Sequence, residues 1–205
     1  LYNMAAYGMS RVGRDAEAIL YFGNRITYGE LMDDVHAFAA GLVSLGVKKG
    51  DFVTICLPNM PQCVVAVYAV NRIGAVCNLV HPLSTKKEIA DAVRLCDSKV
   101  ILTFEMNEGH AEGLGAQIIR CATPEFFPKN PKGFVMKTVY RHSVRKAPKA
   151  AEVLLWRDVL QSGRDYLQTA ELPEDTVRYE DTAAVMYTGG TTGEAKGVLL
   201  SNGAF

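Results

Sequence analysis

The residues best suited to chemistry stand near the end of the sequence, in the stretch Tyr187 to Val198, which reads YTGGTTGEAKGV. Glycine adopts positive φ angles at no steric cost, so a loop this rich in glycine can turn its backbone N–H groups into a concave nest for anions. Threonine hydroxyls add donors, and a lysine ammonium is a compact, mobile cation that suits phosphate oxygens. The stretch therefore predicts a triphosphate-binding loop, with side-chain donors at Thr188, Thr191, Thr192 and Lys196.

This loop departs from the Walker A pattern. That pattern has glycine immediately before the lysine and serine or threonine immediately after it, whereas Ala195 and Gly197 flank Lys196 here. The apolar run GVLLS that follows is typical of a strand, so we expect a loop that joins two strands. From these residues alone, a glycine-rich hairpin that binds nothing is an alternative.

The elements that precede the loop predict the sheet that positions it. Thr27 with Glu30 and Thr85 with Glu88 form capping boxes, and Pro61 suits the first turn of a helix, so three helices are expected to begin at these points. Short apolar runs typical of strands alternate with them, at residues 18–22, 52–58, 75–80, 99–103 and 183–187. This alternation predicts an α/β fold with a parallel sheet and helices on both faces.

Residues 106–181 have a looser pattern. We interpret them as a variable basic insert and linker between a βαβ core at 1–105 and a strand, phosphate loop and strand at 182–205, with helices at 134–146 and 153–163. A run of like charges is ordinarily a solvated face, and an alternative is that residues 126–149 contact an anionic membrane surface. Between Glu125 and Glu152 every charged residue is basic, namely Lys129, Lys132, Lys137, Arg141, Arg145, Lys146 and Lys149.

Composition excludes several classes of protein. Lys plus Arg and Asp plus Glu number 22 each, so no overall positive charge points to nucleic acid. No apolar run reaches the roughly 18 residues that span a bilayer, and the N-terminal residues do not form a signal peptide. We interpret the cysteines as reduced cytosolic thiols, because they are odd in number and include no C-x-x-C pair: Cys56, Cys63, Cys77, Cys96 and Cys121. The four histidines are scattered and no pair has the spacing of metal ligands.

The stretch YTGGTTGEAKGV closely resembles the signature loop of the adenylate-forming superfamily, which includes acyl-CoA synthetases, luciferases and adenylation domains of peptide synthetases. The family pattern is Y-T-S-G-T-T-G-x-P-K-G-V, so Gly189 replaces a serine and Ala195 a proline. The stretches RITYGEL and LVSLGVKKGDFVTICLPN, and residues 61–103, also resemble the opening of these enzymes. Gly189 together with HPLSTKKEI is most similar to bacterial long-chain fatty acid CoA ligases.

The resemblance implies a two-step reaction. A carboxylate attacks the α-phosphorus of MgATP to give an acyl-adenylate and pyrophosphate, and the thiol of coenzyme A then displaces AMP. By matching position, the residues that would contact the β- and γ-phosphates are Thr188, Gly189, Gly190, Thr191, Thr192, Gly193 and Lys196. Lys196 would also stabilise charge in the first step, and Thr191 or Thr192 would lie near the magnesium ion.

Two other functions stay open at this point. One is an adenylation domain that loads amino or aryl acids onto a carrier protein, and the other is a non-catalytic binding module with the same fold. In the family, the adenine pocket, the magnesium-binding glutamate, the ribose-binding aspartate and the catalytic lysine follow the signature loop, so these 205 residues alone are expected to be inactive. We expect a cytoplasmic protein, at most peripheral at the inner face of a membrane, and a homodimer is compatible with the sequence.

Overall fold

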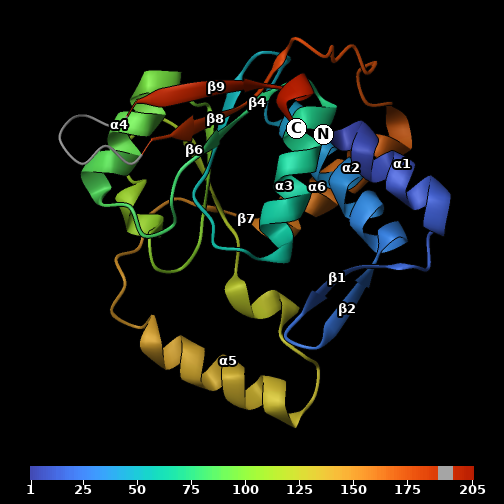
Figure 1. The fold of residues 1–205 in the computed structure, drawn as a ribbon. Coiled ribbons are helices and arrows are strands. Elements are labelled where there is room, and N and C mark those ends of the chain that lie inside the picture. The colour runs from blue at the N-terminus through green and yellow to red at the C-terminus, as the bar shows by residue number, and fades with distance from the viewer. Residues whose placement is uncertain (189–195) are drawn as a thin grey trace.

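The computed structural model describes residues 1–188 and 196–205. Its centre is a seven-stranded sheet with the strand order β7-β6-β5-β3-β4-β8-β9 (Figure 1), in which every neighbouring pair is parallel except β8 and β9. A separate antiparallel hairpin is formed by β1 (Glu17–Tyr21) and β2 (Asn24–Thr27). The strands of the large sheet are β3 (Phe52–Ile55), β4 (Val76–Leu79), β5 (Val100–Thr103), β6 (Gln117–Arg120), β7 (Leu154–Leu155), β8 (Thr182–Tyr187) and β9 (Gly197–Ser201).

Helices cover both faces of this sheet, as the sequence predicts. One face packs against α2 and α3, with α6 and α1 beside them, and α4 covers the other face (Figure 1). The fifth helix, α5, lies apart from the sheet at the bottom of the view. The bounds are α1 (Tyr2–Val12), α2 (Tyr28–Ser44), α3 (Pro61–Arg72), α4 (Lys86–Cys96), α5 (Pro131–Ser143) and α6 (Trp156–Thr169), with short 3-10 turns at Glu108–His110, Thr123–Phe126 and Asn202–Ala204.

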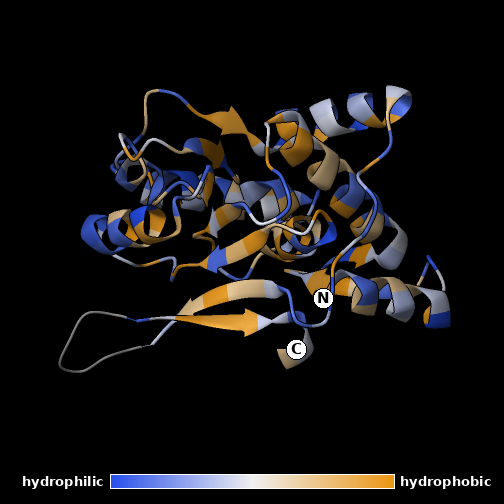
Figure 2. Ribbon diagram, turned by 90° about the horizontal axis from the view of Figure 1, so that it is seen from above, coloured by the Kyte–Doolittle hydropathy of each residue, from blue (hydrophilic) through white to orange (hydrophobic). Residues whose placement is uncertain are grey.

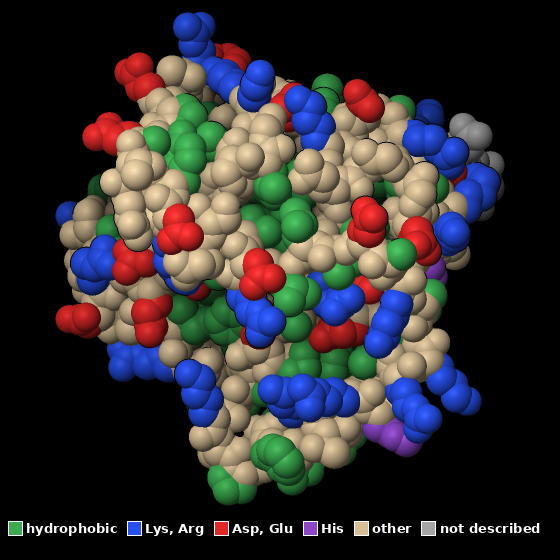
Figure 3. Space-filling model, turned by 180° about the vertical axis from the view of Figure 1, so that it is seen from behind, with side chains coloured by type: hydrophobic (Ala, Val, Ile, Leu, Met, Phe, Trp, Pro, Cys, Tyr) green, Lys and Arg blue, Asp and Glu red, His purple; other side chains and the backbone are tan. Residues whose placement is uncertain are grey.

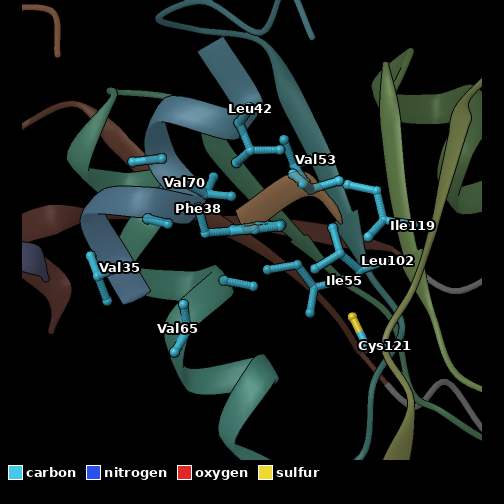
Figure 4. Packing of buried hydrophobic residues seen from close by; sticks show 14 of the residues in the cluster. Val35, Phe38, Leu42, Val53, Ile55, Val65, Val70, Leu102, Ile119 and Cys121 are labelled. Atoms are coloured by element: carbon cyan, nitrogen blue, oxygen red, sulfur yellow. The ribbon is translucent and has the colours of Figure 1, made fainter. Parts of the chain in front are cut away.

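The main core lies between the sheet and α2. Side chains from one face of α2 point toward β3, β5 and β6 (Figure 4). Phe38 is fully buried and stacks on Trp156 of α6, with the two ring centroids 4.1 Å apart. Burial of a large side chain of this kind stabilises a fold by about 1.5–3 kcal/mol, so this layer contributes much of the stability of the helix–sheet packing.

Both predicted capping boxes are confirmed. The Thr27 hydroxyl accepts from the backbone N–H of Glu30, and the Glu30 carboxylate accepts from the backbone N–H of Thr27. Thr85 and Glu88 make the same reciprocal pair at the start of α4. The two boxes begin helices on opposite faces of the sheet, so local sequence sets where these two helices start.

Several predicted bounds between residues 106 and 181 are wrong. The predicted helix at 134–146 runs instead from Pro131 to Ser143, because the side chain of Asn130 accepts from the N–H of Gly133 and caps the helix earlier. The predicted helix at 153–163 starts at Trp156 and continues to Thr169. This segment also contributes β6 and β7 to the large sheet, and the sequence analysis predicts no strand there. It also misses α1 and β2.

Gly163 explains why the predicted helix ends six residues before α6 does. It reads as a helix stop, but it lies inside the helix at the contact with α2. A Cβ atom at this position would lie 1.8 Å from the carbonyl oxygen of Ala37, and one at Gly41 would lie 2.5 Å from the carbonyl oxygen of Val159. The two glycines therefore allow the backbones of α2 and α6 to touch.

Among the described residues, no helix is both long and apolar enough to cross a membrane. All five cysteines are free thiols, and four of them are buried. Burial raises the pKa of the Cys56 thiol to about 12 and that of the half-buried Cys63 thiol to about 11. These thiols are therefore protonated and unreactive at neutral pH.

Candidate functional site

The glycine-rich stretch connects the end of β8 to the start of β9. These strands pair antiparallel at the edge of the sheet (Figure 2), with Tyr187 opposite Gly197. The last backbone hydrogen bond before the loop runs from the N–H of Thr188 to the carbonyl oxygen of Lys196, at 3.0 Å. The prediction that this loop joins two strands, and not a strand and a helix, is confirmed.

Strand β8 is held on its other side by β4. The two strands pair in parallel from Cys77 opposite Ala184 to Leu79 opposite Met186. Strand β4 pairs in turn with β3, so β8 is an internal strand of the sheet. The loop follows the carboxyl end of β8. In open α/β sheets, ligands bind outside the carboxyl ends of the strands.

A buried polar network locks the end of β8. The Tyr187 hydroxyl donates to Oδ1 of Asn78 at 2.8 Å, and Nδ2 of Asn78 donates to Oγ1 of Thr54 at 2.9 Å. The Thr54 hydroxyl donates in turn to Oγ of Ser98. Burial raises the pKa of Tyr187, so its phenol stays protonated and remains a donor. Tyr187 therefore acts as a packing and positioning residue at the base of the loop.

Asn78 and Thr54 are functional positions that the sequence patterns do not single out. Both lie in strands that read as apolar runs, and both are fully buried. The signal was a polar side chain within an apolar strand, which must find a hydrogen-bond partner when it is buried.

The structure brings two of the predicted loop residues together. Thr188 and Lys196 lie opposite each other at the two ends of the loop, and both are exposed. Within the described part of the chain, no hydrogen bond or ion pair involves the Lys196 ammonium, so it is available to an anion. The other predicted residues, Gly189, Gly190, Thr191, Thr192 and Gly193, lie outside the described residues.

A metal site is not found in the described part of the chain. No group of three or more histidine, cysteine, aspartate or glutamate side chains lies close enough there to hold an ion. Thr191 and Thr192, the predicted neighbours of magnesium, lie outside the described residues. What the described site offers is a rigid strand end, two exposed loop ends and one cation, which suit the binding of a phosphate chain.

Comparison with known families matches nearly the whole chain. A family model described as AMP-binding enzyme matches residues 9–205. Among curated proteins, the acetyl-coenzyme A synthetase of Desulfatibacillum aliphaticivorans is 34% identical over 199 residues, which are 93% of this chain and 29% of that protein. The acetyl-coenzyme A synthetase of Syntrophobacter fumaroxidans is 34% identical over 214 residues, which cover 100% of this chain and 31% of that protein. The chain thus spans about a third of the length of these relatives.

Solved structures share the fold. The N-terminal subdomain of Klebsiella oxytoca NpsA, in complex with 3-hydroxyanthranilyl-AMSN, matches 98% of this chain and 40% of its own, with a TM-score of 0.66 and 19% identity. The anthranilate CoA ligase AuaEII in complex with anthranoyl-AMP matches 98% of this chain and 34% of its own, with a TM-score of 0.74 and 16% identity.

Proposed function

The chain belongs to the AMP-binding enzyme family, and from this premise we propose that it forms the N-terminal part of an ATP-dependent ligase that joins a carboxylic acid to coenzyme A through an acyl-adenylate. The observation that carries the proposal is the glycine- and threonine-rich stretch, whose ends Thr188 and Lys196 are paired at the carboxyl end of β8. A cytoplasmic location is part of the same proposal.

The loop is proposed to hold the β- and γ-phosphates of ATP. Backbone N–H groups of Gly189, Gly190 and Gly193 would donate to phosphate oxygens, and the hydroxyls of Thr188, Thr191 and Thr192 would add donors. Lys196 would neutralise charge that develops on the departing pyrophosphate. Magnesium, when bound with ATP, would neutralise phosphate charge, with Thr191 or Thr192 as the proposed neighbour.

The identity of the acid is a separate part of the proposal. The sequence analysis expects a long-chain fatty acid, from Gly189 and the stretch HPLSTKKEI. The relatives named above are acetyl-coenzyme A synthetases instead, which favours a short-chain acid. The neighbours of similar fold were solved with 3-hydroxyanthranilyl-AMSN and with anthranoyl-AMP, and at 16–19% identity they support the fold alone.

We expect the full-length protein to catalyse ATP–pyrophosphate exchange only when its carboxylic acid is present. The measurement is a panel of acetate, palmitate, anthranilate and amino acids with radiolabelled pyrophosphate. Exchange with acetate alone supports the short-chain assignment, and exchange with palmitate supports the fatty acid. Exchange with amino or aryl acids only would contradict both the short-chain and the fatty acid assignments, and no exchange with any acid would favour a non-catalytic module. The 205-residue chain alone serves as a control and should show no exchange.

A second proposal concerns the outer face of α5, which we propose contacts an anionic membrane surface. Phe134, Val135 and Val139 of this helix are 73%, 59% and 64% exposed, although they are apolar. Lys132 on the same helix and Lys129 before it are exposed beside them. Apolar side chains flanked by cations are typical of helices that lie in a membrane interface, and each cation contributes about 1 kcal/mol near anionic lipid.

The protein is therefore expected to sediment with vesicles of phosphatidylcholine and phosphatidylglycerol, and not with phosphatidylcholine alone. Phe134→Ser with Val139→Ser should reduce this binding, because it removes apolar area from the exposed face. Leu20→Ser with Leu83→Ser is the matched control, since these two exposed apolar side chains lie on other elements and are 64% and 70% exposed. Equal binding to both vesicle types, or none, contradicts the proposal.

A further inference from the structure

A cavity lined mostly by charged residues lies between the inner face of α5 and the carboxyl end of β6. Its volume is about 480 Å³, within the range of small-molecule pockets. Figure 3 shows basic side chains gathered where the lobe at the bottom of the molecule meets the body, with acidic side chains among them. The side chains that line the cavity include six basic ones, Arg120, Lys137, Arg141, Arg145, Lys149 and Arg157, and three acidic ones, Glu105, Glu108 and Glu125.

Two of the three carboxylates already have strong partners within the fold. Glu108 is buried, forms a bidentate ion pair with Arg120 and accepts from the backbone N–H of Ala150. Glu105 accepts from the backbone N–H and hydroxyl of Thr123, at 3.1 and 2.9 Å, and from the Tyr140 hydroxyl at 2.9 Å. These two acids are therefore used to connect β5, the turn after β6 and α5.

The third carboxylate, Glu125, makes fewer contacts with the rest of the fold. Glu125 accepts from Nε2 of Gln62 at 3.1 Å, and burial raises its pKa. A higher pKa means that the protonated, neutral form is favoured more than in solvent. Within the described residues Glu125 forms no ion pair, so it does not neutralise any one cation of the cavity directly.

The basic side chains of α5 and of the segment after it lack such partners. Within the described residues, no acidic side chain forms an ion pair with Lys137, Arg141, Arg145 or Lys149. Lys137 and Arg141 are four residues apart on one helix, a spacing at which like charges destabilise the helix. An anion bound among these side chains would offset this repulsion.

We propose that this cavity binds the phosphate group of a small phosphorylated molecule, at a site separate from the glycine-rich loop. Arg141 and Arg145 are the principal ligands, because guanidinium groups form bidentate hydrogen bonds with phosphate oxygens. The cavity is larger than one phosphate, so it has room for the organic part of the molecule. Strands β6 and β8 are four positions apart in the sheet, roughly 19 Å at the usual strand spacing, so one phosphate chain does not fill both sites.

The test is calorimetric titration of the protein with sodium pyrophosphate at constant ionic strength, accompanied by thermal unfolding. Arg141→Gln with Arg145→Gln should weaken binding by about tenfold or more, since a hydrogen bond to a charged group contributes roughly 1.5–3 kcal/mol. The same variant should lose the rise in Tm that pyrophosphate produces in the unmodified protein. Glu125→Gln should tighten binding, because it removes a negative charge from the lining of the cavity and keeps a side-chain acceptor for Gln62.

Two controls separate this site from other sources of binding. Lys132→Gln with Lys146→Gln removes the same charge from the same segment, but neither lysine lines the cavity. Because salt screens charge interactions over distance, the affinity for pyrophosphate should change less than about twofold. Lys196→Ala alters only the glycine-rich loop and should leave this binding event in place. Equal weakening by both double variants, loss of all binding in Lys196→Ala, or binding to phosphatidylglycerol vesicles without any binding of pyrophosphate would each overturn the proposal.

Discussion

Replacing Lys196 with alanine in the proposed full-length ligase is expected to slow acyl-adenylate formation by roughly one to three orders of magnitude. Lys196 directly precedes β9, and its carbonyl oxygen accepts from the backbone N–H of Thr188. In the proposed reaction its ammonium would neutralise charge on the leaving pyrophosphate. Loss of one preorganised donor to a developing negative charge costs on the order of 3 kcal/mol at the transition state, or about a hundredfold in rate. Single-turnover measurement of adenylate formation from acid and ATP gives the rate directly.

The second half-reaction is the internal control for this variant. Thioester formation from pre-made acyl-adenylate should change little, because pyrophosphate has already left the site. Equal slowing of the two steps would mean that Lys196 supports the fold of the hairpin and not the first chemical step. Lys196→Arg keeps the charge but not the compact shape of the ammonium, so it should retain part of the rate.

Gly163→Ala is expected to destabilise the protein by about 3 kcal/mol or more, although alanine is a better helix former than glycine by about 1 kcal/mol. The new Cβ would lie 1.8 Å from the carbonyl oxygen of Ala37, which belongs to the backbone of α2 and cannot rotate away. The two helices must therefore move apart, and the contact between Phe38 and Trp156 is disturbed with them. Urea unfolding followed by circular dichroism measures the change.

Gly8→Ala is the matched control, since Gly8 is also inside a helix. A Cβ atom there would lie 3.4 Å from the Tyr28 hydroxyl, an ordinary contact with a side chain. Its stability should stay the same or rise by up to about 1 kcal/mol. If Gly163→Ala behaved like Gly8→Ala, the backbones of α2 and α6 would not be in contact as the structure shows.

Local sequence was sufficient where a few neighbouring residues determine the structure. The capping boxes at Thr27 and Thr85 begin their helices as predicted, because both partners of each hydrogen bond lie within four residues. The hairpin around the glycine-rich loop was predicted for the same reason, since apolar runs stand directly on both sides of it. The alternation of strands and helices likewise indicated the parallel sheet.

Tertiary structure decided the features that depend on residues far apart in the chain. Gly163 reads as the end of a helix, and only the approach of α2 shows that it is a packing position within α6. Strand β6 is four residues long and becomes a strand because β5 and β7 pair with it on either side.

The basic segment, residues 126–149, shows most directly which properties follow from sequence and which depend on the tertiary structure. Its composition established that residues 126–149 carry positive charge, and left open whether that charge faces solvent or an anionic membrane. Only the fold separates the two sides of α5, with Val135 and Val139 exposed on one and Lys137 and Arg141 lining a cavity on the other. The physical reason is that a cavity is made by the partner surface, here the end of β6 with Glu105 and Glu108. That surface is up to 36 positions earlier in the chain, as from Glu105 to Arg141, so no local pattern contains it.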